Sequence, residues 1–304
     1  MKDAILIAGP TASGKSGLAL DLAERCGGIV VNADSMQVYG ILDRLTARPQ
    51  AADMARAPHV LYGHVHPSVA YSTGAWLRDV ERLIDEGAFA GRPAIFVGGT
   101  GLYFRALTEG MSEMPDIPPP VRERWRLALH EQGAHRLHGI LAQKDAAAAA
   151  TLRPGDSQRI LRALEVLEAS GQSILQWQAK RGGPLVDAGS ARLLVVEPAR
   201  TELVRRIDAR FEAMMEQGAL DEVRELCALG LDAAKPAMKA IGVRELAAAL
   251  TGELTMEEAT ERARIATRQY AKRQATWFRH QFDARWHRVG NLDDASGQMH
   301  TFSL

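Results

Sequence analysis

The chain has 304 residues, of which 46% are hydrophobic and 24% are charged, a composition that excludes extensive disorder. The formal net charge is zero, so a site for a polyanion can come only from local charge segregation. The two cysteines, Cys26 and Cys227, form no metal-binding motif, and no apolar run approaches the roughly 18 residues of a membrane helix. We therefore expect a cytoplasmic protein without a membrane partner.

A phosphate-binding loop is predicted near the start of the chain. The apolar run 4–8 predicts a strand, and the amphipathic segment 17–24 predicts a helix. The spacing G-x-x-x-x-G-K-[ST] between them is met by Gly9, Pro10, Thr11, Ala12, Ser13, Gly14, Lys15 and Ser16. Backbone N–H groups of such a loop bind phosphate oxygens, Lys15 can reach the terminal phosphates, and the Ser16 hydroxyl can hold a Mg²⁺ ion. The loop predicts a phosphorylated ligand but does not say which bond is broken.

Further apolar runs predict the fold class. Those at 29–32, 94–97 and 191–196 are typical of buried parallel strands. Prolines at 115 and 118–120 and the segment 182–184 bracket a region with helical patterns alone. We predict an α/β fold: a P-loop NTPase-like parallel sheet with helices on both faces, formed by residues 1–112 and 187–304, and a helical insertion domain at 113–186.

Asp34 and Thr100 follow the second and third predicted strands. Ligands of an open α/β sheet collect at the carboxyl ends of its strands, so Asp34 is expected to face the same crevice as the phosphate loop. Asp34 suits a Mg²⁺ ligand or a general base, and the alternative is a helix N-cap. Glycines around Thr100 allow close approach of a ligand, and the alternative is a tight turn. No acid ends the third strand, which weakens an ATPase hypothesis.

Two groups of basic residues could bind RNA. Arg159 and Arg162 share one face of a predicted helix, where they can clamp phosphate or pair with Glu165 and Glu168 on a solvated face. The segment 262–288 combines many basic residues with interleaved aromatics, which is typical of a surface that tracks a nucleic-acid backbone. Within it, a stripe on one helix face is formed by Arg264, Arg268 and Lys272. The alternative for the aromatics Trp277 and Phe278 is core packing.

In this order the motifs resemble those of the tRNA dimethylallyltransferases, enzymes that prenylate N6 of the adenosine next to the anticodon. The resemblance covers nearly the whole chain and is carried by segments 9–16, 32–39, 71–72, 97–103, 156–165, 238–242 and 267–279.

The resemblance implies dimethylallyl diphosphate as donor, Mg²⁺ as helper and the tRNA anticodon stem-loop, modified at position 37, as acceptor. It also implies an insertion that grasps the stem-loop beside the core. Residues 9–16 would hold the diphosphate, Asp34 would be the base toward the adenine amino group, and Thr100 would assist at the reacting centre. An arginine, placed at Arg210 rather than Arg206, would neutralise the leaving diphosphate. The tRNA contacts implied are Asp34, Ser35, Met36, Gln37, Thr100, Arg122, Gln158, Arg159, Ile160, Leu161 and Arg162. We expect a monomer, because a single tRNA needs no symmetric partner.

The chain departs from this family's pattern in one loop. Family members continue as Arg-Gly-Leu-Asp-Ile-Gly-Thr-Ala-Lys where this chain has Gly40-Ile-Leu-Asp-Arg-Leu-Thr-Ala-Arg48. The usual His-His pair is His59-Val60 here. Arg48 keeps the positive charge, whereas Gly40 and Leu45 alter a phosphate contact and the geometry of the loop. The reacting groups are unchanged.

Three other hypotheses explain part of the sequence. A P-loop kinase of small molecules would use residues 9–16 but has no need of the basic C-terminal segment. A prenyltransferase acting on free adenine nucleotides would leave the insertion and that segment idle. A non-catalytic RNA-binding module would need neither Lys15 nor Asp34.

Overall fold

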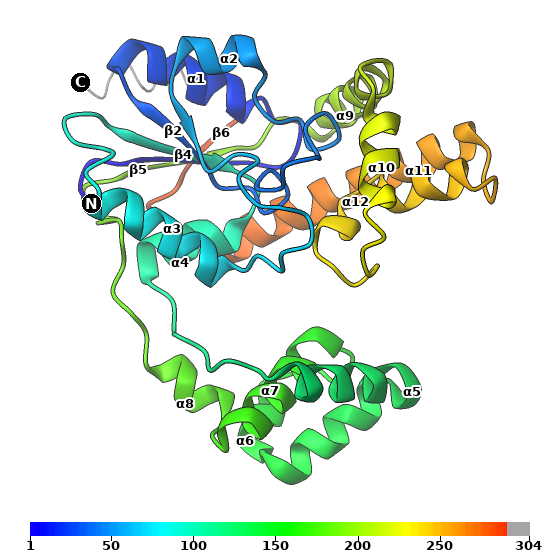
Figure 1. Ribbon diagram of the computed structural model, residues 1–304. Helices are drawn as coiled ribbons and strands as arrows, with labels where there is room; N and C mark the ends of the chain where they lie inside the picture. Colours follow the sequence, from blue (N-terminus) through cyan, green and yellow to red (C-terminus); the bar gives the residue numbers. More distant parts are fainter. Residues whose placement is uncertain (291–304) are drawn as a thin grey trace. The chain divides into compact units, whose positions relative to one another are not determined.

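A computed structural model describes residues 1–290 and contains a parallel sheet of six strands (Figure 1). The strands lie in the order β3-β2-β4-β1-β5-β6. Their bounds are β1 Ile5–Ala8, β2 Ile29–Asn32, β3 His59–Val60, β4 Ala94–Gly98, β5 Arg192–Val196 and β6 His287–Val289. The four longer strands were predicted from their apolar runs. The edge strands β3 and β6 were not, because two or three residues carry no periodic pattern.

Helices cover both faces of the sheet, so that every residue of β1, β2 and β4 is buried. One face carries α1 (Lys15–Cys26) and α2 (Ala51–Arg56), and the other carries α3 (Thr73–Asp85) and α4 (Gly101–Glu109) (Figure 1). Two apolar clusters result, one around Leu18 and Leu22 of α1, the other around Trp76 of α3 and Phe104 of α4. The predicted fold class is confirmed.

The C-terminal part of the core unit is helical. It comprises α9 (Arg200–Glu216), α10 (Ala219–Ala228), the 3₁₀ turn η1 (Ala237–Lys239), α11 (Val243–Leu250) and α12 (Met256–Gln281). Helix α12 begins at a capping box in which Thr255 and Glu258 bond reciprocally to backbone N–H groups. Near its end Phe278 is buried in the core, and Trp277 packs edge-on against it. At least part of the C-terminal aromatic set is therefore packing.

Residues 109–184 form a separate compact helical unit. Its helices are α5 (Pro119–Lys144), broken at Gly133 where φ is 76°, α6 (Ala146–Ala150), α7 (Ser157–Ser170) and α8 (Ile174–Ala179). The unit has its own apolar core, which includes Trp125, Leu137 and Ile160. The remaining described residues, 1–108 and 185–290, belong to the sheet-containing unit. None of the helices in residues 1–290 combines the length and apolarity needed to cross a membrane.

Candidate active site

The predicted phosphate loop links β1 to α1 in a tightly packed turn. Gly9 leaves no room for a side chain, because a Cβ there would lie 2.7 Å from Ser13 Oγ and 2.8 Å from Val196 O. Gly14 caps α1 with a φ of 91°, in the left-handed region that glycine adopts without strain. The N-terminus of this helix therefore faces the loop, and its free N–H groups form an anion-binding end.

Lys15 and Arg210 bring positive charge to this loop. Lys15 Nζ donates a hydrogen bond to Pro10 O at 3.1 Å. Loss of contact with water lowers the pKa of Lys15 to about 8; the neighbouring Arg210 also lowers it, whereas Asp34 opposes the shift. Arg210 reaches over from α9 and donates a hydrogen bond to Thr11 Oγ1. The loop thus combines two cations within electrostatic range of one carboxylate.

Arg206, the other candidate on α9, is engaged differently. Its Nε donates to Glu202 at 2.6 Å, and Nη1 donates to Ser13 O at 3.3 Å on the phosphate loop. Arg210 lies one turn later on the same face of α9. It interacts electrostatically with both Lys15 and Asp34. Of the two arginines, Arg210 is therefore the one whose charge acts on both Lys15 and Asp34, and its role at a leaving diphosphate stays a prediction.

Asp34 is held in place by a fully buried asparagine, Asn32, at the end of β2. The Asn32 Oδ1 accepts from Asp34 N–H at 2.8 Å, while its Nδ2 donates to Asp34 O and to Leu61 O, both at 3.0 Å. Asp34 Oδ1 accepts from Met36 N–H at 2.9 Å. The next helix starts only at Ala51, so the N-cap alternative for Asp34 is wrong. Sequence reasoning missed Asn32, although a polar residue ending an apolar strand is a usable signal.

Thr100 and the Asp34 segment contact each other directly. Thr100 Oγ1 accepts from Ser35 N–H at 2.9 Å and donates to Ser35 Oγ at 3.3 Å. The glycines of the β4–α4 loop permit this approach, because a Cβ at Gly98 would overlap the Ala33 carbonyl and one at Gly99 would lie 3.3 Å from Asp34 Oδ2. Asp34, Ser35 and Thr100 are therefore brought together as predicted.

Ser16 is the predicted Mg²⁺ ligand, and its side chain is exposed at the start of α1. The part of the chain that is described, residues 1–290, holds no group of three or more His, Cys, Asp or Glu side chains suited to a metal. Mg²⁺ commonly keeps several waters and binds through one or two protein ligands plus substrate phosphates. One accessible hydroxyl beside a phosphate loop fits that mode of binding, whereas an all-protein cage is not present in this range.

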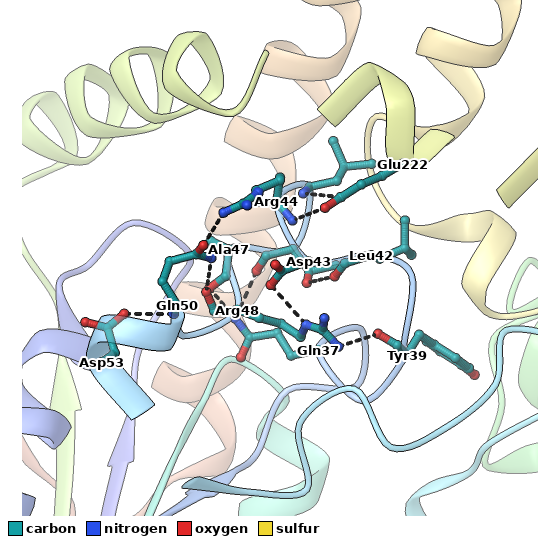
Figure 2. Close-up of polar contacts among 12 residues, drawn as sticks. Gln37, Tyr39, Leu42, Asp43, Arg44, Ala47, Arg48, Gln50, Asp53 and Glu222 are labelled. Atoms are coloured by element: carbon teal, nitrogen blue, oxygen red, sulfur yellow. Dashed lines mark hydrogen bonds and ion pairs between the residues drawn. The ribbon is translucent and has the colours of Figure 1, made fainter. Parts of the chain in front are cut away.

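The loop after Asp34 is closed by its own hydrogen bonds (Figure 2). Gln37 Nε2 donates to Thr46 O and Ala47 O, both at 2.9 Å. Arg48 pairs with Asp43 at 3.2 Å and donates to Tyr39 O at 3.1 Å. The side chains of Arg48 and Gln37 therefore both form their hydrogen bonds within the loop itself.

Helix α10 anchors the other side of this loop. Glu222 accepts from the backbone N–H groups of Arg44 at 2.6 Å and Leu45 at 3.0 Å (Figure 2). The Leu45 side chain packs over Gly242, where a Cβ would lie 2.9 Å from Leu45 Cδ1. Leu45, one of the departures from the resembled pattern, thus packs directly on the 238–242 segment.

In the helical unit, the predicted tRNA contacts have different exposures. Gln158, Arg122 and Arg159 are exposed, with Arg159 paired to Asp156 at 3.5 Å. The Ile160 side chain is fully buried in the core of this unit, so the tRNA contact predicted at Ile160 is left to its backbone and stays a prediction. Leu161 is partly buried against the same core.

Arg162 lies in a polar cluster of the same unit. It pairs with Glu165 at 3.6 Å, and Arg122 of α5 also acts on this carboxyl. Burial raises the pKa of Glu165, whereas the two arginines oppose the shift. Arg122 and Arg162 therefore gather around one buried acid. The pairing of Arg162 with Glu165 was one of the two alternatives, and the phosphate clamp stays a prediction.

The basic stripe of α12 is partly neutralised by acids that sequence reasoning did not place beside it. Arg264 pairs with Glu212 at 2.6 Å, and Arg268 pairs with Asp208 at 3.2 Å, both acids coming from α9. Lys272 is exposed and, within residues 1–290, has no acidic partner. Its tRNA role stays a prediction, and Lys272 is the member of the stripe that offers an unpaired charge.

Comparison with known proteins gives consistent relatives over the whole chain. A family described as IPP transferase matches residues 37–281. A tRNA dimethylallyltransferase of Mesorhizobium japonicum is 67% identical over 301 residues, covering 99% of this chain and 94% of that protein. The crystal structure of a tRNA isopentenylpyrophosphate transferase from Bacillus halodurans is similar with a TM-score of 0.70 and 31% identity, covering 99% of this chain and 95% of that one.

A eukaryotic dimethylallyltransferase, whose structures are described as snapshots of the enzyme acting on tRNA, is similar with a TM-score of 0.81 and 26% identity, covering 99% of this chain and 78% of that one. The family match spans well over half of the chain and includes the Thr100 loop, α7, Arg210 and α12. The chain belongs to the IPP transferase family, which includes the tRNA dimethylallyltransferases.

Proposed function

We propose that this enzyme transfers a dimethylallyl group from dimethylallyl diphosphate to N6 of the adenosine adjacent to the anticodon, position 37, in tRNA, and releases diphosphate. The observation that carries the proposal is one arrangement: the phosphate loop with Lys15 and Arg210 lies within electrostatic range of Asp34, and Asp34 adjoins Thr100. This combination suits a reaction in which a diphosphate leaves and an amine loses a proton. The high identity to named tRNA dimethylallyltransferases supports it.

The chemistry follows from the reactants. The exocyclic amine of adenine is a weak nucleophile, because its lone pair is delocalised into the ring. In an allylic diphosphate, stretching of the C–O bond spreads positive charge over the allyl group and builds negative charge on the diphosphate. The C–O bond breaks, a C–N bond to N6 forms, and the amine proton passes to Asp34 as general base.

The phosphate loop thus binds a leaving group, and no phosphoryl group is transferred. Lys15, Arg210 and the loop N–H groups stabilise the charge that grows on the diphosphate, which is where preorganised donors contribute most. Ser16, together with diphosphate oxygens, would hold Mg²⁺, which would supply further positive charge at the leaving group. Thr100 assists by fixing the Ser35 backbone, and with it the segment that carries Asp34.

The residues proposed to bind the acceptor tRNA are chosen for their positive charge and their exposure. An adenosine in an anticodon loop is already single-stranded, so placing it in a pocket costs less than extruding it from a duplex. Exposed arginines of the helical unit, Arg122 and Arg159, and Lys272 of α12 would bind backbone phosphates. We propose a monomer that works in the cytoplasm, where its tRNA substrate is found.

The test is mass-spectrometric analysis of nucleosides from unmodified tRNA incubated with the protein, Mg²⁺ and dimethylallyl diphosphate. AMP and ATP serve as parallel acceptors. We expect N6-prenyladenosine in tRNA alone. Transfer to a free nucleotide would favour the nucleotide prenyltransferase hypothesis, and phosphoryl transfer from ATP without prenylation would favour a kinase.

A further inference from the structure

Helix α12 contains a buried glutamine that joins two loops of the active site. Gln274 is 5% exposed, and it is among the few buried polar residues of the chain. Its Oε1 accepts from the Thr11 N–H of the phosphate loop at 2.9 Å, and its Nε2 donates to Gly99 O of the β4–α4 loop at 2.9 Å. One amide therefore holds a donor on one loop and an acceptor on the other.

The surroundings of Gln274 leave it little freedom. A Cβ at Gly99 would overlap Gln274 Nε2, so the amide lies directly on that glycine. Tyr270, one turn earlier on α12, also interacts with the Gln274 amide. One turn later, Trp277 covers Gly101 so closely that a Cβ there would overlap its ring. The two glycines that flank Thr100 are thus each covered by a side chain of α12.

These contacts connect the phosphate loop to the Asp34 segment in one continuous series. Thr11, which also accepts a hydrogen bond from Arg210, is joined through Gln274 to Gly99. The adjoining Thr100 is joined to Ser35, next to Asp34. The phosphate-loop end of this series would hold the predicted leaving group, and the Ser35 end adjoins Asp34, the predicted base.

We propose that Gln274 is a positioning residue that sets the distance and orientation of the phosphate loop relative to the Thr100–Asp34 side of the active site. The inference rests on the proposed function, because it concerns the alignment of a diphosphate and a base in one reaction. Gln274 touches neither reactant in this role. Its loss should lower kcat far more than it changes KM for either substrate, because each half-site stays intact while their alignment is lost.

An amide is needed for chemical reasons. Only a group that both accepts and donates can serve Thr11 N–H and Gly99 O together. In Gln274→Glu the ionised carboxylate accepts only, so it faces the Gly99 carbonyl oxygen without a proton between them. A protonated carboxyl has one O–H donor and one acceptor, and so restores both bonds. Burial and the nearby Asp34 raise the pKa of a carboxyl placed there, whereas the cations Lys15, Arg210 and Arg273 oppose this shift.

The experiment compares tRNA prenylation by the wild type, Gln274→Glu, Gln274→Met and a control, Gln217→Glu, which changes an exposed glutamine at the end of α9, outside the basic segment 262–288. At about pH 8 we expect kcat to fall about 10- to 100-fold in both Gln274 variants, with each KM within about threefold of wild type. As the pH is lowered, the ratio of the kcat of Gln274→Glu to that of the wild type should rise, whereas the ratio for Gln274→Met should stay flat.

Circular dichroism and thermal unfolding show first which variants are folded at each pH. If Gln274→Met is not folded, the pH dependence of Gln274→Glu decides alone. An active wild type with Gln274 variants that match the Gln217→Glu control, or a ratio that does not change with pH, would overturn the inference and leave the proposed function standing. A wild type that cannot prenylate tRNA would overturn the proposed function and this inference with it.

Discussion

The reacting centre and the arginines predicted to hold tRNA differ in what their polar groups already contact. At the centre, Asp34 is fixed through Asn32, and Thr100 through Ser35, by hydrogen bonds between neighbouring loops. On α12, by contrast, Arg264 and Arg268 are only partly exposed and already pair with acids of α9.

This difference bears on how each region would work. In a centre whose polar groups are already oriented, no free energy is lost to reorienting them when charge develops in the transition state. A paired arginine must give up its acid to bind a phosphate, so its net contribution to affinity is smaller than that of an unpaired lysine. Changes at the centre should therefore act mainly on turnover, and changes at the basic surface mainly on affinity and its salt dependence.

The largest effect is expected at Asp34. Replacing it in Asp34→Asn keeps the shape and the acceptor for Met36 N–H but removes the base, so kcat should fall by about 10²–10⁴-fold. Affinity for tRNA, measured separately by filter binding, should change little. A large loss of tRNA binding with normal turnover at saturating tRNA would mean that Asp34 binds tRNA and is not the base.

Arg210 should come next and can be tested against Arg206. In Arg210→Met the charge beside the phosphate loop is lost, and kcat should drop by about 10²–10³-fold, as is typical for loss of a transition-state donor. Arg206→Met, on the same helix, removes a cation that is already paired with Glu202 and should have a much smaller effect. Equal losses in steady-state kinetics would mean that both arginines serve the diphosphate.

Lys15 should make donor binding sensitive to pH. Its pKa is lowered to about 8 by burial, so the ammonium is charged below that pH and loses its proton above it. The KM for dimethylallyl diphosphate should therefore rise above about pH 8, approaching tenfold per pH unit. Lys15→Arg, which keeps its charge, should flatten this profile. An unchanged slope in that variant would assign the titration to another group.

The basic surface should show smaller effects, graded by pairing. Lys272→Met should reduce the slope of log affinity for tRNA against log salt by about 0.7–0.9, the value for one phosphate contact. Arg268→Met should change the slope less, because Arg268 pairs with Asp208. Fluorescence anisotropy with labelled tRNA over a range of salt gives both slopes. If neither variant changes the slope, the basic residues of the stripe do not bind tRNA and are only a solvated helix face.

The smallest effect concerns the loop in Figure 2, which belongs to neither region. Glu222 accepts two backbone N–H groups, and in Glu222→Gln one acceptor oxygen becomes a donor, so stability should fall by about 1 kcal/mol. Thermal unfolding measures this directly. Because the loop carries Gln37, a rise in the KM for tRNA with unchanged kcat would support the tRNA contact predicted at Gln37, and an unchanged KM would count against it.

The sequence predicted the sheet and the site where a local pattern carries the information. The strands β1, β2, β4 and β5 and the phosphate loop follow from apolar runs and glycine spacing. Asp34 was placed at the phosphate-loop edge by the rule that parallel strands present their carboxyl ends there, and Thr100 was placed beside it by the family resemblance.

What could not be predicted depends on contacts between distant segments. The pairing of Arg264 with Glu212 and the span from Gln274 to Thr11 and Gly99 join elements far apart in sequence. The burial of Ile160 is set by the packing of α7 on α5, and β3 and β6 are too short to carry a period. A motif gives the residue type at a position, whereas the partner of each side chain is fixed only by the tertiary structure.

The central claim is that the phosphate loop binds a leaving group. ³¹P nuclear magnetic resonance during tRNA prenylation tests it directly, because the signals of dimethylallyl diphosphate, diphosphate, orthophosphate and ATP are distinct. We predict one intact diphosphate released for each N6-prenyladenosine formed, with added ATP unchanged. Orthophosphate as the product, or prenylation that consumes ATP, would contradict this account.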